Sequence, residues 1–277
     1  FKINEDVVIP LERLGDYTDG VERINIEFSI RNKLAVLDAV EAYLAGAPRV
    51  GKTGEADTDR LPPEEVLGER PRLALEVIAA ARRRWSWLLG HMDSPVAESL
   101  DDLAGIGVGL RAAHAESRID RDPRVRIFDL LQDRSIRISW KTEVRGELRR
   151  IFAGGPFTPL LDDVTSAHQR VLRGRVFVAL HMHAGDGNVH TNIPVNSDDY
   201  AMLQEANGAV ARIMRIAREL DGVISGEHGI GITKLEFLDE RELDGFRAYK
   251  ERVDPEGRFN KGKLLPGADL RDAYTPS

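Results

Sequence analysis

The 277-residue sequence predicts an α+β fold, in which an antiparallel sheet has helices on one face and a mainly helical segment is inserted into the domain. One observation is a set of short strand-like stretches separated by helical patterns, near residues 3–10, 174–183, 188–195 and 222–226. The other is a change to helical composition after the first helix. We therefore divide the chain into a first part, 1–49, an insertion, 50–173, and a second part, 174–277.

The N-terminal stretch begins with a short strand. Asp6-Val-Val-Ile-Pro10 is β-branched and is stopped by proline. Apolar residues from Leu11 to Leu44 mostly have helical spacing, which predicts a helix. From Ile24 to Ile30 they alternate, so a strand is the alternative prediction for that stretch. Residues 46–53 match the phosphate-binding P-loop pattern, but a helix precedes them and no helix follows, so we read the match as chance.

The insertion reads as helices without a catalytic constellation. Helical patterns cover Leu73–Leu89, Ala97–Glu116 and Arg124–Phe152. His91 and His114 have no nearby partner in sequence, and we expect them to be surface or packing residues. We expect no site residue in this segment and a role in contacts with other domains or subunits.

A β-hairpin is predicted between Val176 and Val195, because apolar residues alternate on both sides of a Gly-Asp-Gly-Asn turn signal. In simple register His183 faces His190 across a loop of residues 184–189. Since strand side chains alternate between faces, polar residues converge on one side and apolar ones on the other. The polar set is His181, His183, His190 and Asn192, and the apolar set is Val178, Leu180, Val189 and Ile193.

This hairpin is suited to a metal ion. Imidazoles on facing strands can reach one divalent cation, and zinc favours such ligands. Glu227, in the glycine-rich stretch 226–231, is the best third ligand. The alternative is that the histidines are only hydrogen-bonded turn residues. We favour the metal because four of the seven histidines lie in these two glycine-rich segments.

After the hairpin, residues Ser197–Leu220 and Leu235–Val253 have helical patterns, with a short strand at 223–225 between them. The composition of the chain excludes several classes of function. A net charge of −7 argues against general nucleic-acid binding, and zero cysteines exclude disulfides and thiol chemistry within this chain. No apolar run is long enough to span a membrane. Because the chain starts at Phe1, we expect a fragment of a longer protein.

Three motifs occur together in a known order, at 183–190, 226–231 and 254–263. With the strand at 5–10 they resemble the C-terminal domain of FAD-linked oxidases, in the glycolate oxidase, D-lactate dehydrogenase and D-2-hydroxyglutarate dehydrogenase group of the vanillyl-alcohol-oxidase superfamily. The resemblance covers roughly 1–45 and 174–267 and implies a ferredoxin-like sheet. The similar N-terminal start together with a long insertion resembles the large bacterial flavoproteins that join an FAD domain, this domain and an iron–sulfur domain in one polypeptide.

The resemblance implies a role for several residues. His183, His190 and Glu227 are the expected metal ligands, and His228 is the expected base that takes a proton from a 2-hydroxy acid. Asn192 and Lys2 are the expected substrate contacts, and Asn260 the expected flavin contact. Lys2 lies earlier than the lysine usual before the acidic pair, and Lys261 replaces a common proline.

The implied cofactors are FAD, held mainly by a domain absent from this chain, and zinc or manganese. The implied partners are a small D-2-hydroxy acid and the FAD-binding and iron–sulfur domains of one polypeptide, and a homo-oligomer is left open. We expect a cytoplasmic location, with membrane association only through partners. Alone, the chain should bind no FAD tightly and show negligible turnover. A metal-dependent hydrolase and a non-catalytic interaction domain stay open as alternatives.

Overall fold

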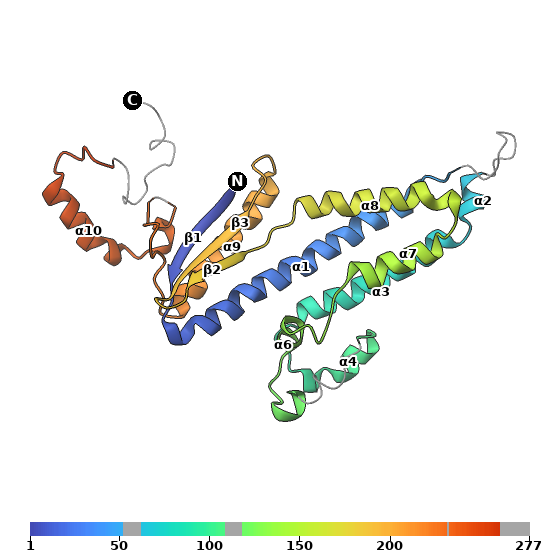
Figure 1. Ribbon diagram of the computed structural model, residues 1–277, viewed down its shortest axis with the longest axis horizontal. Coiled ribbons are helices and arrows are strands. Elements are labelled where there is room, and N and C mark those ends of the chain that lie inside the picture. Colours follow the sequence, from blue (N-terminus) through green and yellow to red (C-terminus); the bar gives the residue numbers. More distant parts are fainter. Residues whose placement is uncertain (52–61, 109–117, 232, 261–277) are drawn as a thin grey trace. The chain divides into compact units, whose positions relative to one another are not determined.

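A computed structural model describes residues 1–51, 62–108, 118–231 and 233–260 (Figure 1). The chain forms two compact units. The first unit comprises Phe1–Val21 and Val176–Ser277, and the second comprises Glu22–Arg175. The borders predicted from the sequence, 1–49, 50–173 and 174–277, stay a prediction.

The first unit is built on a three-stranded antiparallel sheet, which confirms the predicted α+β class. Its strands are β1 (Lys2–Val8), β2 (Ala179–His183) and β3 (Asn188–Pro194), in the order β1-β3-β2. One face of the sheet is apolar and buried, because Val7, Val189 and Ile193 alternate with polar residues along their strands. The apolar stripe of α9 (Tyr200–Glu219) is buried in the same unit.

The predicted strand at 222–226 is wrong beyond a single residue pair. Val223 forms an isolated antiparallel bridge with Val8, at 2.9 and 2.8 Å. This pair lies beside β1, the position that a fourth strand takes in a ferredoxin-like sheet. The pairing stops there because the next amides, at Gly226, Glu227 and His228, donate to a side-chain carboxylate instead of a strand.

The hairpin was predicted correctly, but its register was not. His183 pairs with Asn188 and His181 pairs with His190, so the loop has only residues 184–187. Gly187 has a φ of 74°, a conformation that glycine adopts easily, and this allows the return strand to begin at residue 188 after a shorter loop than predicted. Facing residues differ from the prediction by two positions, and side chains repeat every two residues. The predicted histidines therefore still share one face.

Helix α1 (Leu14–Ala45) follows a 3-10 turn, Leu11–Arg13, and begins in the first unit. It includes Ile24 to Ile30, so the strand alternative there is excluded. Gly20 lets α1 approach α9 closely, since an added Cβ would lie 3.1 Å from Ile216. No helix in the described ranges combines the length and apolarity needed to cross a membrane.

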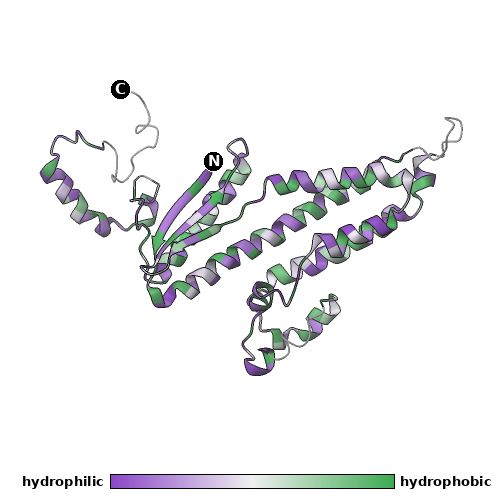
Figure 2. Ribbon diagram, in the orientation of Figure 1, coloured by the Kyte–Doolittle hydropathy of each residue, from purple (hydrophilic) through white to green (hydrophobic). Residues whose placement is uncertain are grey.

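The second unit is a helical assembly around a core that contains Leu37, Trp85 and Phe152. Figure 2 shows both hydrophobic and hydrophilic residues along its long helices. Most of α1, from Glu22 on, belongs to this unit. Its other helices within the described residues are α2 (Pro63–Leu67), α3 (Arg70–Gly90), α4 (Leu100–Gly105), α6 (Ile127–Gln132), α7 (Gly146–Ile151) and α8 (Thr158–Arg173). Short turns lie at Val96–Glu98, Lys141–Arg145 (a π-helix) and Gly155–Phe157.

The predicted continuous helix Arg124–Phe152 is wrong. It breaks after α6, where the Asp133 carboxylate accepts a 2.8 Å hydrogen bond from the Ser135 amide and Arg134 has a φ of 64°. The helix predicted over Ala97–Glu116 ends at Gly105, and residues 109–117, with His114, lie outside the described part. Residues 52 and 53 of the P-loop match also lie outside it.

Candidate metal and substrate site

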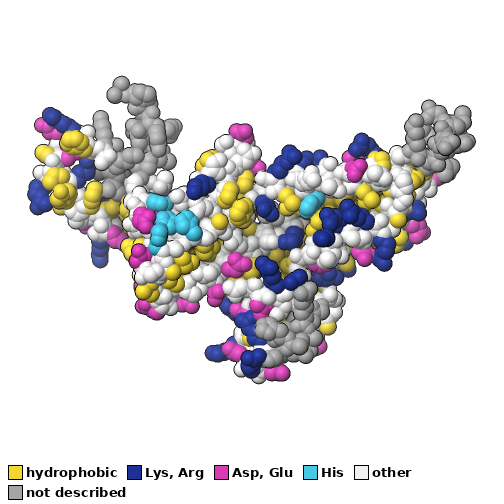
Figure 3. Space-filling view, in the orientation of Figure 1, with side chains coloured by type: hydrophobic (Ala, Val, Ile, Leu, Met, Phe, Trp, Pro, Cys, Tyr) yellow, Lys and Arg dark blue, Asp and Glu magenta, His cyan; other side chains and the backbone are white. Residues whose placement is uncertain are grey.

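The polar face of the sheet collects side chains from all three strands. β3 lies in the centre, and its register sets Asp6 beside His190 on one side and His181 beside His190 on the other. Figure 3 shows several histidine side chains gathered in one surface cluster. The polar residues on this face are Lys2, Asn4, Asp6, His181, His183, Asn188, His190 and Asn192.

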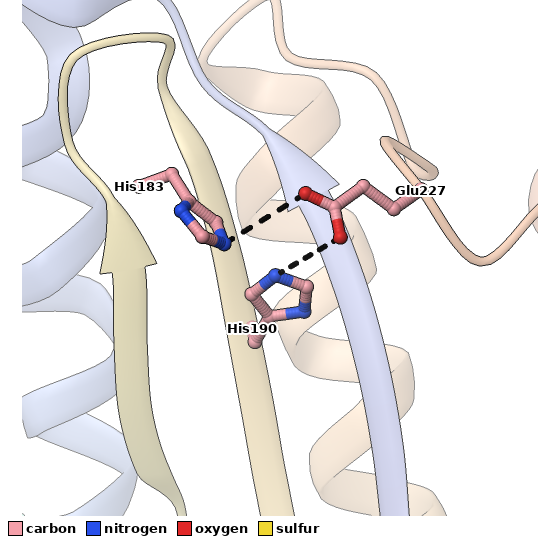
Figure 4. Close-up of side chains that lie close together, drawn as sticks. All are labelled: His183, His190 and Glu227. Atoms are coloured by element: carbon pink, nitrogen blue, oxygen red, sulfur yellow. Dashed lines mark ion pairs between the residues drawn. The ribbon is translucent and has the colours of Figure 1, made fainter.

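His183, His190 and Glu227 converge as the sequence predicted. One ligand atom from each lies within 4.8 Å of the other two. Nε2 of His183 lies 3.8 Å from Oε1 of Glu227, and Nε2 of His190 lies 3.7 Å from Oε2 (Figure 4). Ligands about 2.1 Å from a tetrahedral zinc ion would be about 3.4 Å apart, so small side-chain rotations would close the site.

The donor chemistry fits a divalent cation. Two imidazoles and one carboxylate are ligands that zinc commonly takes. Among the described residues, only the two histidines form ion pairs with Glu227, so no lysine or arginine neutralises its charge. His190 is 6% exposed, whereas His183 and Glu227 are 59% and 56% exposed. A cation here would have one buried ligand and an open side for a substrate.

Asn188 contacts two of the three predicted ligands, Glu227 and His190. Its Nδ2 donates a 2.6 Å hydrogen bond to Oε1 of Glu227 and lies 3.5 Å from Nε2 of His190. Outer residues of this kind orient metal ligands. Gly226 keeps the loop close to this amide, because a Cβ there would lie 2.7 Å from Oδ1 of Asn188.

The other two predicted histidines surround His190. The ring of His181 stacks on it, with centroids 4.7 Å apart and planes at 14°. The ring of His228 lies 5.2 Å away at 43°. His228 is therefore next to the predicted ligands without belonging to the three-residue group.

Asp6 and Lys234 form a buried pair that the sequence analysis missed. Asp6 is 0% and Lys234 2% exposed, and Lys234 Nζ donates to Oδ1 of Asp6 at 2.6 Å. Oδ2 accepts from the amides of Gly226, at 2.8 Å, Glu227, and His228, at 3.1 Å. Burial alone would raise the pKa of Asp6, but these hydrogen bonds and the Lys234 charge together hold the pKa well below its ordinary value.

One signal in the sequence could have identified Asp6. An aspartate that directly precedes Val7, Val8 and Ile9 in a strand is unfavourable unless its carboxylate has a specific partner. No comparable signal identifies Lys234, which lies 228 residues away along the chain.

The two predicted substrate contacts lie together on the same face. Lys2 Nζ donates a 2.9 Å hydrogen bond to Oδ1 of Asn192. Nδ2 of Asn192 lies 3.3 Å from Nδ1 of His181, which stacks on His190. The row extends from the predicted metal ligands to an exposed ammonium group, which can attract an anionic substrate.

Asn260 is not brought to this site. It is exposed, has a φ of 48°, and ends the described C-terminal segment after α10 (Glu240–Val253) and the 3-10 turn Leu235–Phe237. Asp254 organises the segment by accepting hydrogen bonds from the amides of Arg258 and Phe259. Within the described residues, no hydrogen bond or ring contact joins Asn260 to the histidines.

Comparison with protein families gives a match over the segment that carries the hairpin and the 226–231 loop. Residues 156–264 match the model of "FAD linked oxidases, C-terminal domain". This segment is therefore similar to the C-terminal domain of FAD-linked oxidases. The match contains the hairpin and the 226–231 loop, so the resemblance inferred from their motifs is confirmed.

Curated relatives agree with that family. The chain is 37% identical over 93 residues to the glycolate oxidase subunit GlcD of Escherichia coli strain K12, covering 32% of this chain and 19% of GlcD. It is 28% identical over 115 residues to mitochondrial D-lactate dehydrogenase [cytochrome] of Arabidopsis thaliana (40% and 20%). It is 33% identical over 89 residues to D-2-hydroxyglutarate dehydrogenase of Stutzerimonas stutzeri (30% and 19%). The alignments span about a fifth of each relative.

Proposed function

We propose that this chain is the substrate- and metal-binding part of a flavin-dependent oxidoreductase that oxidises a D-2-hydroxy acid. The observation that carries the proposal is the convergence of His183, His190 and Glu227 beside His228. The names of the relatives, which include glycolate, D-lactate and D-2-hydroxyglutarate enzymes, support this substrate class.

Each residue has a defined task in this proposal. His183, His190 and Glu227 would hold zinc or manganese, and Asn192 and Lys2 would orient the substrate carboxylate. His228 would take the proton of the substrate hydroxyl, because an imidazole can accept a proton near neutral pH. When bound, the cation would acidify the hydroxyl and FAD would accept the hydride.

The remaining partners belong to the same proposal. FAD would be held mainly by a separate FAD-binding domain, with Asn260 contributing a contact, and an iron–sulfur domain would belong to the same polypeptide. The chain alone would then bind no flavin tightly and turn over negligibly. The cytoplasmic location is also part of the proposal.

Metal removal from the complete flavoprotein tests the function. Expressed from its whole gene, the protein should reduce an electron-acceptor dye with a D-2-hydroxy acid, and a chelator should lower the rate at least about tenfold because the substrate loses its anchor. Zinc or manganese should restore the rate. Ester hydrolysis without flavin would favour the hydrolase instead. Inactivity with all D-2-hydroxy acids, together with no metal, would favour the interaction domain.

A further inference from the structure

The loop that carries Glu227 and His228 has little regular structure of its own. Between the Val223 bridge and the turn at Leu235–Phe237, the described residues form no helix or strand. Such loops are usually mobile unless their backbone groups have fixed partners. Both side chains nevertheless have to meet His190 on the sheet.

Asp6 supplies those partners from the sheet itself. One oxygen, Oδ2, accepts the three consecutive amides of Gly226, Glu227 and His228, which form a concave anion-binding backbone. The other, Oδ1, accepts Lys234 and lies 3.5 Å from the Ser225 hydroxyl. Oδ2 therefore binds the loop amides, and Oδ1 binds the buried ammonium group of Lys234.

The strand register connects this anchor to the hairpin. Asp6 pairs with His190 across β1 and β3, so the residue that fixes the loop is the direct neighbour of the buried predicted ligand. Nδ1 of His228 lies 3.6 Å from Oδ1 of Asp6, so the same carboxylate also lies beside the proposed base.

We infer that Asp6 is a positioning residue whose carboxylate fixes the loop so that Glu227 and His228 meet His183 and His190 in working geometry. Lys234 has the supporting task of neutralising that buried carboxylate. The expected effect of Asp6 on metal binding rests on the proposed function, whereas the anchoring of the loop can be measured without any metal.

The test compares Asp6→Asn with Glu5→Gln in the 277-residue chain. Both changes remove one negative charge next to Lys234, which lies 2.6 Å from Asp6 and 3.4 Å from Glu5. Glu5 pairs with Thr191, so its side chain leaves the opposite face of the sheet and contacts none of the three amides. Three quantities are measured for each variant: urea unfolding, amide hydrogen exchange at 226–228, and zinc affinity.

Asp6→Asn should speed exchange at the three amides at least about tenfold beyond any change in global unfolding, and weaken zinc binding by about 10- to 100-fold. Glu5→Gln should change neither. If Asp6→Asn does not fold because Lys234 is left unpaired, the variant Asp6→Asn/Lys234→Met removes both charges and should show the same local effects.

Equal exchange in Asp6→Asn and Glu5→Gln would overturn the inference. Faster exchange with unchanged zinc affinity would also overturn it, because the loop could then move without consequence for the site. If the wild-type chain binds neither zinc nor manganese, the proposed function fails, whereas the exchange comparison still decides whether Asp6 fixes the loop.

Discussion

Replacing His228 with glutamine is expected to lower kcat of the complete flavoprotein by about 10²- to 10⁴-fold, the usual contribution of a general base. His228 lies beside the buried ring of His190 but outside the group of three converging ligand atoms. Glutamine keeps a polar side chain of similar length and cannot take the proton. Steady-state kinetics with the preferred D-2-hydroxy acid measure the effect.

The same variant should keep its bound metal and its flavin, which separates loss of the base from loss of the site. His91→Gln is the matched control, since His91 belongs to the second unit and stacks on Trp87. A kcat for His228→Gln within about threefold of wild type would contradict the assigned role.

Gly187→Ala is expected to destabilise the chain by about 3 kcal/mol or more. Gly187 has a φ of 74°, and a Cβ at this position would lie 2.1 Å from the carbonyl oxygen of Ile9. The backbone cannot move away without losing the 2.9 Å hydrogen bond from the Ile9 amide to the Gly187 carbonyl. Urea unfolding of the 277-residue chain measures the difference.

Gly185→Ala is the control from the same turn, because an added Cβ there has no atom within 4 Å. It should change the unfolding free energy by less than about 1 kcal/mol. Similar unfolding free energies for the two variants would show that the turn tolerates a side chain at both positions, contrary to the packing described for Gly187.

The convergence of His183, His190 and Glu227 could be predicted because it depends mainly on local rules. Because side chains alternate along a strand, a shift of the hairpin register by two residues keeps the two histidines on the same face. The register itself could not be predicted, since it depends on Gly187 packing against Ile9, which directly follows β1 and is distant in sequence. The error in loop length therefore left the predicted group intact.

The features that were missed depend on contacts between distant parts of the chain. Asp6 and Lys234 meet only after folding. The Asp6 carboxylate also accepts the amides of 226–228, so the chain does not continue as the strand expected at 222–226. The break after α6 depends on the side chain of Asp133 competing for backbone groups, which apolar periodicity does not report.

Zinc titration calorimetry on the chain, repeated with manganese, tests the central claim most directly. We predict one ion per wild-type chain and an affinity at least about 100-fold lower in His190→Ala. His183→Ala should give a similar loss, and because His183 is 59% exposed its replacement should leave the fold intact. No binding of either ion, or equal affinity in wild type and both variants, would contradict the metal site.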